Sequence, residues 1–566
     1  MIYQRITPLI LIVSIVLCGL FGCIKKLDQI PQTSLTDISF WKTTNDLKLA
    51  CNYLYSYLPG LNNDAGTGEA TPALDNYSEI AYNLTGGANS ISDGSRLATA
   101  TSAPWSNYYK LIRACNNILE KSGDITGDEA LIDQYVGEAK FFRALAYYNL
   151  VKRFGDVPYI NRTLTMTDSM LYAGRLNRQI VVDSIYADLD YAAQYCPTAA
   201  QQGVENYGRI TSGAAIAYKS RVALFEGTWD KFHQQGDYKA NLNTAIEAAD
   251  QLMSGGQYSL FDYPAMKDSS YFYLFQYQNP VSQTNWTYAN NKEIILAHLY
   301  GLSISSNYLS HTFERGNATD GAVSATRQLI NQYLYKDGLP VGKSMYDSSA
   351  METSSLTTFR NRDPRFGMTF YKTNEIYPSI NGMIPYTPKA SYILRKYNTI
   401  TDFAASTSFM NFWIIRYAEV LLNYAESVYE FNDAISDADL DKSINLIRAR
   451  AGVPPLTNDF VQSHGLNMQA EIRRERTVEL CFEGFHYWDL LRWKTAEQEL
   501  PQSLLGTKYF PEEMPTVSNP PLDANGFIIL EDKTKRNFQS NRDYLWPLPT
   551  KEIGLNPKLT QNPNWE

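Results

Sequence analysis

The fold is decided by stretches such as residues 212–225, which read SGAAIAYKSRVALF. Alanines at 214, 215, 217 and 223 give this segment small side chains on which a neighbouring helix can approach closely. Close contact of this kind is how stacked helix pairs pack in repeat proteins. The stretch therefore predicts a helix that pairs with its neighbours.

Apolar residues recur at helical spacing along much of the chain, and the alternation typical of strands is rare. We expect helices over 43–58, 104–121, 129–154, 179–196, 212–234, 239–254, 410–431, 438–451 and 468–496. Helices paired by short turns predict a mainly α, tetratricopeptide-like scaffold, although no strict repeat of about 34 residues can be recognised. Long irregular stretches lie between them, over 59–102, 255–320, 337–409 and 501–566. Loops of such length in a compact protein are usually functional.

The chain begins with an apolar run that stops at a cysteine. Residues 6–22 carry no charge, with Arg5 ahead of them and lysines soon after, which is typical of a secretory signal. The sequence LFGC at 20–23 resembles the bacterial lipobox, in which cleavage precedes a cysteine that carries lipid. This pattern predicts a signal peptide over 1–22 and lipidation of Cys23. The alternative is an ordinary secreted protein in which this cysteine is incidental.

Charge and cysteine content exclude some classes of protein. The chain has 50 basic and 59 acidic residues and no basic cluster, which argues against nucleic acid as a partner. Four cysteines remain beyond the signal and the anchor, and each lies in a helical pattern: Cys51, Cys115, Cys196 and Cys481. We expect buried free thiols there and no disulfide. Tyrosine, at 41 residues against 24 phenylalanines, supplies many rings with a polar tip.

Four glutamates share one face of a predicted helix because they recur at every fourth residue: Glu471, Glu475, Glu479 and Glu483. Like charges at this spacing repel unless they are paired. Arginines of the same segment are the expected countercharges: Arg473, Arg474, Arg476 and Arg492. An enzyme could use two such carboxylates as acid and base in glycoside hydrolysis. We favour a structural ion network, and therefore predict no catalysis here.

His486 lies three residues after the last of these glutamates, a spacing that could place metal ligands on one helix face. The chain has only five histidines and no HExxH pattern, so a packed histidine is favoured and no metal site is predicted. Walker and dinucleotide-binding patterns are also missing from the sequence, which predicts no cofactor.

Several long motifs resemble those of SusD/RagB outer-membrane lipoproteins, in order and over nearly the whole chain. They are EAKFFRALAYYNLVKRFGDVPY (138–159), RYAEVLLNYAE (416–426), INLIRARAGVPPL (444–456), EIRRERTVELCFEGFHYWDLLRW (471–493) and LWPLPTKEIGLNPKLTQNP (545–563). LDQIPQTSLTDISFWKT (27–43) and RDPRF (362–366) fit the same family. The resemblance implies a SusD-like domain over 23–566, with an N-terminal part of about 23–235 and a C-terminal part of about 290–566.

The same resemblance implies a function. Members of this family carry a loop-rich ligand-binding face on tetratricopeptide-like helix pairs. They are lipid-anchored at the surface of the cell outer membrane, over a SusC-type TonB-dependent transporter. They bind oligosaccharides for import and do not act as enzymes. A surface binding protein for peptide or glycopeptide is the first alternative. A glycoside hydrolase is the second.

Two loops combine aromatic faces with amides, carboxylates and arginine, the mixture that grips sugars. The first loop, over 74–96 with its continuation at 103–109, supplies Asp75, Asn76, Tyr77, Tyr82, Asn83, Arg96 and Trp105. The second loop, over 271–291, supplies Asn285, Trp286 and Tyr288. Trp105 suits packing against its own helix as well as it suits a sugar, whereas Trp286 lies in a polar segment without helical period and is expected to be exposed. Tyr308 and Arg362 are further candidates.

Overall fold

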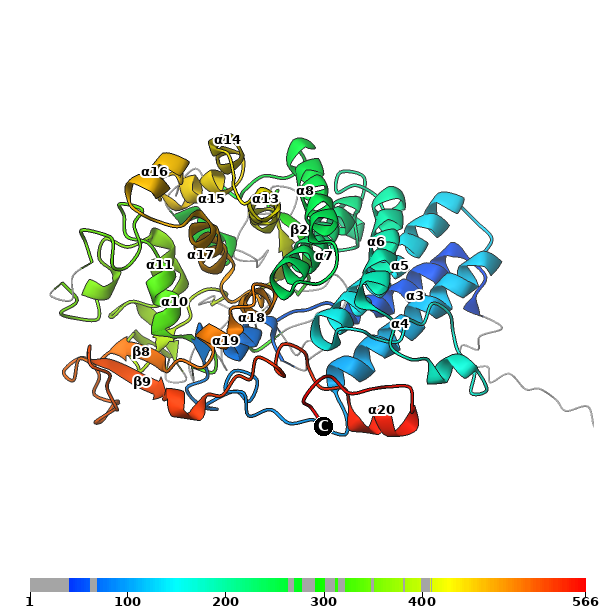
Figure 1. Cartoon of the computed structure of the whole chain (residues 1–566). Helices are drawn as coiled ribbons and strands as arrows, with labels where there is room; N and C mark the ends of the chain where they lie inside the picture. Colours follow the sequence, from blue (N-terminus) through cyan, green and yellow to red (C-terminus); the bar gives the residue numbers. More distant parts are fainter. Residues whose placement is uncertain are drawn as a thin grey trace, which may run out of the picture.

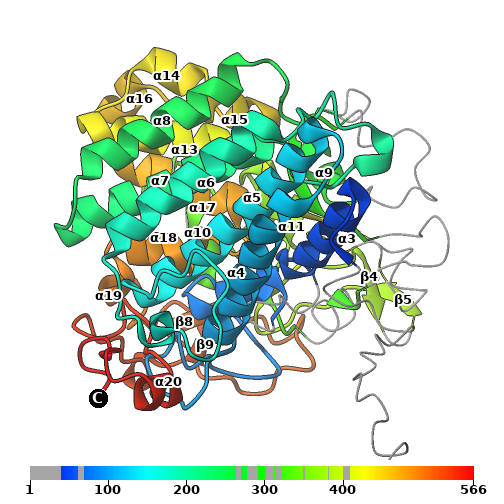
Figure 2. The same cartoon turned by 90° about the vertical axis from the view of Figure 1, so that its right-hand side faces the viewer.

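The computed structural model describes residues 40–61, 69–262, 269–276, 291–300, 311–313, 321–347, 351–379, 382–398, 408 and 410–566. The N-terminal half of this structure is built from α3 (Thr44–Leu54), α4 (Ala103–Lys121), α5 (Glu129–Phe154), α6 (Arg178–Tyr195), α7 (Ser212–His233) and α8 (Tyr238–Ser254). These helices lie side by side in chain order, as Figures 1 and 2 show. The predicted mainly α scaffold of packed helix pairs is confirmed.

Helix α7 contains the alanine-rich stretch and packs closely on α8. Its four alanines are all buried. At Gly227 an added Cβ would lie 2.7 Å from Cγ of Leu242 on α8, so only glycine permits this approach. The helix begins after Thr211, whose side chain accepts a hydrogen bond from the backbone N–H of Ala214. Capping and small residues together fix the position of this pair.

The helices of the C-terminal half are shorter. They are α9 (Ser270–Leu274), α10 (Arg327–Gln332), α11 (Pro364–Thr369), α13 (Tyr417–Asn432), α14 (Asp437–Asp441), α15 (Ile444–Ala451), α16 (Asn458–Ser463), α17 (Met468–Leu480), α18 (His486–Arg492), α19 (Ala496–Glu499) and α20 (Thr550–Leu555). Short 3₁₀ turns are η1 (Tyr55–Tyr57), η2 (Thr71–Tyr77), η3 (Ser122–Asp124), η4 (Ser169–Tyr172), η5 (Val204–Asn206), η9 (Thr357–Phe359) and η10 (Lys533–Lys535). Helix α13 packs on both α8 and α17, and so joins the two halves.

Strands are few and short, and each pairing is antiparallel. A three-stranded sheet consists of β1 (Ala81–Tyr82), β3 (Ser324–Ala325) and β6 (Tyr392–Ile393), in that order. The two-stranded pairs are β2 (Ile294–His298) with β7 (Phe412–Arg416), β4 (Ile376–Ser379) with β5 (Gly382–Pro385), and β8 (Leu504–Lys508) with β9 (Phe527–Glu531). The sheet joins segments that are far apart in the sequence.

Three of the predicted helices differ from those observed. The helix expected over 410–431 begins as β7, whose aromatic and β-branched residues are all buried and pair with β2. The helix expected over 438–451 is divided into α14 and α15. The helix expected over 468–496 is broken between α17 and α18, where Phe482 has φ of 60° and Gly484 has φ of 78°. A right-handed helix cannot continue through these backbone angles.

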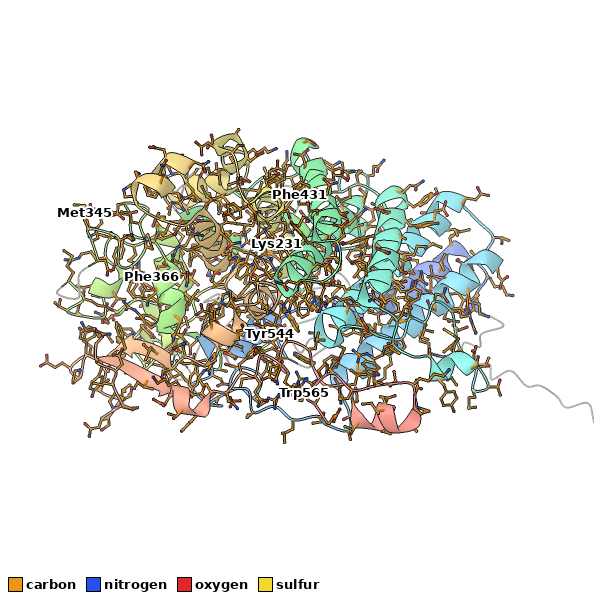
Figure 3. The ribbon with its side chains drawn as sticks, viewed as in Figure 1. Lys231, Met345, Phe366, Phe431, Tyr544 and Trp565 are labelled. Carbon is orange, nitrogen blue, oxygen red and sulfur yellow. The ribbon has the colours of Figure 1, made fainter. Side chains whose placement is uncertain are left out.

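One large hydrophobic cluster runs from Trp41 to Leu559 and includes residues of both halves. In Figure 3, Phe366 lies inside the molecule and Met345 points outward at its edge. Cys51, Cys115, Cys196 and Cys481 are free and buried, as predicted. Within the described ranges, each helix is too short or too polar to span a bilayer.

Candidate functional site

The glutamates of α17 lie at the centre of the molecule in an ion network. Glu479 is fully buried, and its carboxylate accepts hydrogen bonds from Arg365 at 2.9 Å and Arg416 at 2.6 Å. Arg365 also bonds Glu475 at 2.6 Å, and Arg416 bonds Glu483 at 2.8 Å. Although burial opposes it, the surrounding cations lower the pKa of Glu479 and of Glu483. Both carboxylates are therefore held ionised as structural groups.

The countercharges come mainly from other elements, and here the sequence-based prediction was wrong. Of the four arginines expected to neutralise the glutamates of α17, Arg474 alone pairs with one of them in the described structure, with Glu471 at 3.1 Å. Arg473, Arg476 and Arg492 pair with carboxylates outside this row of four. Residues one or two positions apart on a helix point to different faces, so neighbours in sequence are not neighbours in space.

His486 is a packed histidine. Its Nε2 lies 2.8 Å from a carboxylate oxygen of Glu79, and the ring is 7% exposed. Although burial lowers it, the Glu79 carboxylate outweighs this effect and raises the pKa of His486 to about 9. Among the described residues no His, Cys, Asp and Glu side chains are grouped so that they could hold a metal ion.

Part of the first predicted loop lies in the interior. Asp75, Asn76 and Tyr77 belong to η2, which fills the space opened by the break after α17. The Asp75 carboxylate accepts a hydrogen bond from the backbone N–H of Phe482 at 2.6 Å, and burial raises the pKa of Asp75 to about 7. Asn76 donates to the Ala322 carbonyl at 3.1 Å, and these side chains therefore have structural partners.

Tyr77 and Trp105 pack against other rings. Tyr77 meets Tyr487 edge-on with ring centroids 5.7 Å apart. Trp105 is 5% exposed and lies 5.1 Å from the ring of Phe154 on α5. The packing alternative that the sequence left open for Trp105 is the arrangement observed.

Tyr82 and Asn83 lie at the edge of the molecule and are half-buried. Tyr82 is in β1, and the Asn83 side chain accepts backbone N–H bonds from Thr85 at 3.0 Å and Gly86 at 2.7 Å. This turn holds the segment outside the core. Burial raises the pKa of Tyr82, so the phenol stays protonated as a hydrogen-bond donor at neutral pH.

The small sheet brings the first loop toward the second. Through β3, strand β1 leads to β6 and to Arg395, whose guanidinium lies 4.2 Å from the ring centroid of Phe272 in α9. The side chain of Gln276, which ends the described part of the second loop, donates to the Arg395 carbonyl at 3.4 Å. Asn285, Trp286 and Tyr288 lie outside the described residues, as do Tyr308 and Cys23.

Arg96 and Arg362 have aromatic partners. The Arg96 guanidinium lies 3.6 Å from the ring centroid of Trp546, and burial lowers its pKa to about 10. Arg362 is 7% exposed, donates to the backbone carbonyl of Tyr333 at 2.9 Å and lies over the Tyr335 ring. Arg362 therefore has a structural role, whereas Arg96 is half-buried and reaches the surface.

A shallow pocket lies beside the small sheet, and sequence reasoning missed it. Its lining combines rings with hydroxyl groups and includes Ser355, Phe359, Tyr371, Tyr386, Tyr392 and Phe510. Tyr392 comes from β6, while Leu84, directly after Asn83, packs on the cluster of tyrosines that contains Tyr371 and Tyr386. The signal was the tyrosine-rich sequence from 371 to 397. We call this pocket, together with Tyr82 and Asn83, the tyrosine face.

The sequence matches two family models and several proteins of known family. A model of the SusD family matches residues 282–565, and a model described as "Starch-binding associating with outer membrane" matches residues 69–224. SusD-like protein P2 of Formosa agariphila is 25% identical to this chain. The alignment covers 99% of this chain and 98% of the Formosa protein. A SusD-like protein of Bacteroides ovatus is 23% identical, covering 95% of this chain and 94% of its own.

Solved structures share the fold. A SusD-like carbohydrate binding protein from Bacteroides fragilis aligns with a TM-score of 0.75 at 24% identity, covering 92% of this chain and 100% of that one. A second SusD-like protein from the same species aligns with a TM-score of 0.70 at 23% identity, covering 93% of this chain and 98% of that one.

Proposed function

The chain belongs to the SusD family, and on that premise we propose that it is a surface lipoprotein of the outer membrane that binds oligosaccharides and delivers them to a SusC-type TonB-dependent transporter. The observation that carries the proposal is the family match over both halves of the chain. One matched model is described by starch binding and the outer membrane, and one structural neighbour is described as carbohydrate binding. We carry that ligand class over to this chain.

Sugar binding in this proposal takes place on the tyrosine face and the second loop. Rings stack on the C–H surface of a sugar, while amides, hydroxyls and arginine bond its hydroxyl groups. Tyr82 and Asn83 are half-buried, and the pocket contributes rings and hydroxyls. Asn285, Trp286 and Tyr288 of the second loop are proposed as further sugar contacts. Asp75, Asn76, Tyr77 and Trp105 are buried and are proposed to act in the scaffold rather than as contacts.

The protein acts by binding alone in this proposal. Glycoside hydrolysis needs one carboxyl group with a raised pKa as acid and a second as base or nucleophile. The carboxylates of α17, which an enzyme would have used, are buried among arginines that lower the pKa of Glu479. Because the pKa of Glu479 and that of Glu483 are both lowered, these two carboxylates stay ionised and cannot donate a proton to a leaving group near neutral pH.

The size and polarity of the ligand support the proposed transporter, and the lipid anchor would hold the binding protein beside it. A solute of several sugars is too polar to diffuse through a bilayer, so capture needs a neighbouring pore. One acyl chain gives marginal membrane binding, whereas two or more hold a protein stably. Cys23 is the residue proposed to carry them, which would keep the binding protein beside the transporter.

A glycan array tests the binding function, and two membrane experiments test its setting. The purified protein should bind at least one oligosaccharide or polysaccharide and release no new reducing ends from it. Extraction in mild detergent should copurify a TonB-dependent barrel, and Cys23→Ala should lose membrane retention. Binding of peptides in place of every glycan would contradict the proposed ligand class. Normal membrane anchoring of Cys23→Ala would contradict the proposed lipid anchor.

A further inference from the structure

A cavity lies between the N-terminal helices and the turn from α17 to α18, and its lining shares no residue with the tyrosine face. It has about 80 Å³ of free space, which is enough for several waters or one small polyatomic ion. Its lining includes residues of η2, α4, α5, α7, β7 and α18. Lys152, Arg221 and Phe485 at its wall are half-buried, so the cavity approaches solvent on that side.

The wall of the cavity is rich in cations, and most of them are paired. Arg221 bonds Glu419 at 2.6 Å, Arg476 bonds Asp489 at 2.8 Å, and Arg492 bonds the same aspartate at 2.8 Å. These pairs satisfy the charges on one side of the cavity. These three arginines are already neutralised, so they do not require a further anion.

Arg153 differs from these arginines. It is 1% exposed, and its guanidinium donates to neutral acceptors, the backbone and side-chain oxygens of Asn149 at 3.0 and 2.9 Å. In the described parts of the chain no carboxylate lies within ion-pairing distance of it. A buried guanidinium without a counterion is costly, because a charge removed from water needs an opposite charge or a full set of hydrogen bonds.

Three buried polar atoms of residues that line the cavity have no hydrogen-bond partner among the residues that the structure describes. They are Nε of Arg153, Nε1 of Trp488 and Oγ1 of Thr71. All three residues line the cavity and are at least nine-tenths buried. The two nitrogens can only donate and the hydroxyl can donate. Lys152 adds positive charge, with its Nζ 4.6 Å from the ring centroid of Trp488 on which Arg153 also lies.

We propose that this cavity binds one small oxyanion, held by Arg153, Trp488 and Thr71. An oxyanion supplies both the missing negative charge and several acceptor oxygens to groups that only lack acceptors. Waters would satisfy the donors but leave the guanidinium without a counterion. The wall carries five cationic side chains against the two carboxylates of Glu483 and Asp489, and this excess of positive charge disfavours a metal ion. The chemistry suits a sulfate, a phosphate or the carboxylate of an acidic sugar. The inference does not depend on glycan capture at the tyrosine face.

Isothermal titration of the purified protein with sodium sulfate and with sodium glucuronate, at constant ionic strength, tests the proposal. We expect saturable binding of at least one of them. Similar affinity for both indicates that the oxyanion alone is recognised, and much tighter binding of glucuronate indicates an acidic sugar. Absence of binding for both, or equal binding of neutral glucose, would overturn the proposal.

The variant Trp488→Phe separates anion binding from packing. It keeps a ring but removes the unpaired N–H, so anion affinity should fall about tenfold while the Tm without anion stays near that of the parent. Trp565→Phe is the matched control, because its Nε1 donates to the carbonyls of Leu545 at 2.9 Å and Arg542 at 3.1 Å (Figure 3). It should lower Tm and keep the affinity. Unchanged anion affinity in both Trp488→Phe and Arg153→Gln would contradict the assignment.

Discussion

The centre of the molecule and the tyrosine face are built from similar polar residues but in opposite ways. Around α17, carboxylates and arginines are buried and bonded to one another, so each charge has its partner inside the fold. On the tyrosine face, Tyr82 and Asn83 are half-buried, and ring and hydroxyl groups line a shallow pocket. The most conspicuous motif of the sequence is therefore scaffold, whereas an inconspicuous tyrosine-rich segment offers a surface for a ligand.

The largest effect is expected at the centre. Arg416→Met should lower the free energy of unfolding by about 3–5 kcal/mol, because it leaves Glu479, Glu483 and Glu293 buried without this counterion. Urea unfolding followed by circular dichroism measures the loss. The matched control is Arg162→Gln, which breaks an exposed pair with Asp168 and should leave the midpoint unchanged. Equal midpoints for both variants would show that the buried network around α17 stabilises the fold no more than an exposed ion pair does.

The pH dependence of stability sharpens the same contrast. The pKa of His486 is raised to about 9 in the folded protein, so its stabilising contribution is complete below pH 6.5 and is lost as pH rises through 9. The shift corresponds to about 3 kcal/mol. Burial raises the pKa of Asp75 to about 7, so the folded protein also loses stability as the pH rises from about 4 to 7.

His486→Asn should flatten the alkaline part of this profile, which urea unfolding at a series of pH values measures. The groups that face the ring are Glu79, Thr477, Asp75 and Asp489. A parent protein whose stability does not fall between pH 6.5 and 9, or a variant with the same slope, would show that the Glu79 pair is not formed as described.

A smaller effect is expected at Asp75. Asp75→Ala removes the acceptor of the Phe482 N–H and should cost about 1–3 kcal/mol, since a buried donor is left unpaired. Asp75→Asn keeps an acceptor oxygen and should retain most of the stability at neutral pH. Thermal unfolding of both variants makes the comparison. If Asp75→Asn is as unstable as Asp75→Ala, the negative charge rather than the hydrogen bond holds the turn after α17.

Sequence patterns predicted the long helices well and the local interruptions poorly. Helices α5 and α7 are many turns long, so their periodicity and small residues were sufficient. Every residue of the segment at 412–416 is buried, and four of the five are apolar. A short apolar run of this kind does not distinguish strand from helix. The break after α17 depends on Asp75, which is distant in sequence, and no local pattern contains that contact.

The sequence predicted only part of the candidate site, because the rest depends on contacts between segments that are remote in the chain. Composition placed aromatic and amide side chains in two loops, but could not tell which of them turn inward. Tyr77 and Tyr82 are five residues apart, yet one is packed against Tyr487 and the other is at the edge of the molecule. Pairing of β1 with β3, and of β3 with β6, decides which residues meet, and these pairings join segments remote in the chain.

The central claim is that the tyrosine face and the second loop bind the glycan while the interior supports them, and calorimetric titration of the array's best glycan tests it most directly. Stacking on one aromatic ring contributes about 1–3 kcal/mol to binding, by analogy with base stacking on aromatic side chains, so Trp286→Ala and Tyr82→Ala should each bind about tenfold more weakly with nearly unchanged Tm. Trp105→Ala should instead lower the stability by about 3–5 kcal/mol and leave the affinity of the folded protein unchanged. Parental affinity in both Trp286→Ala and Tyr82→Ala would contradict the claim.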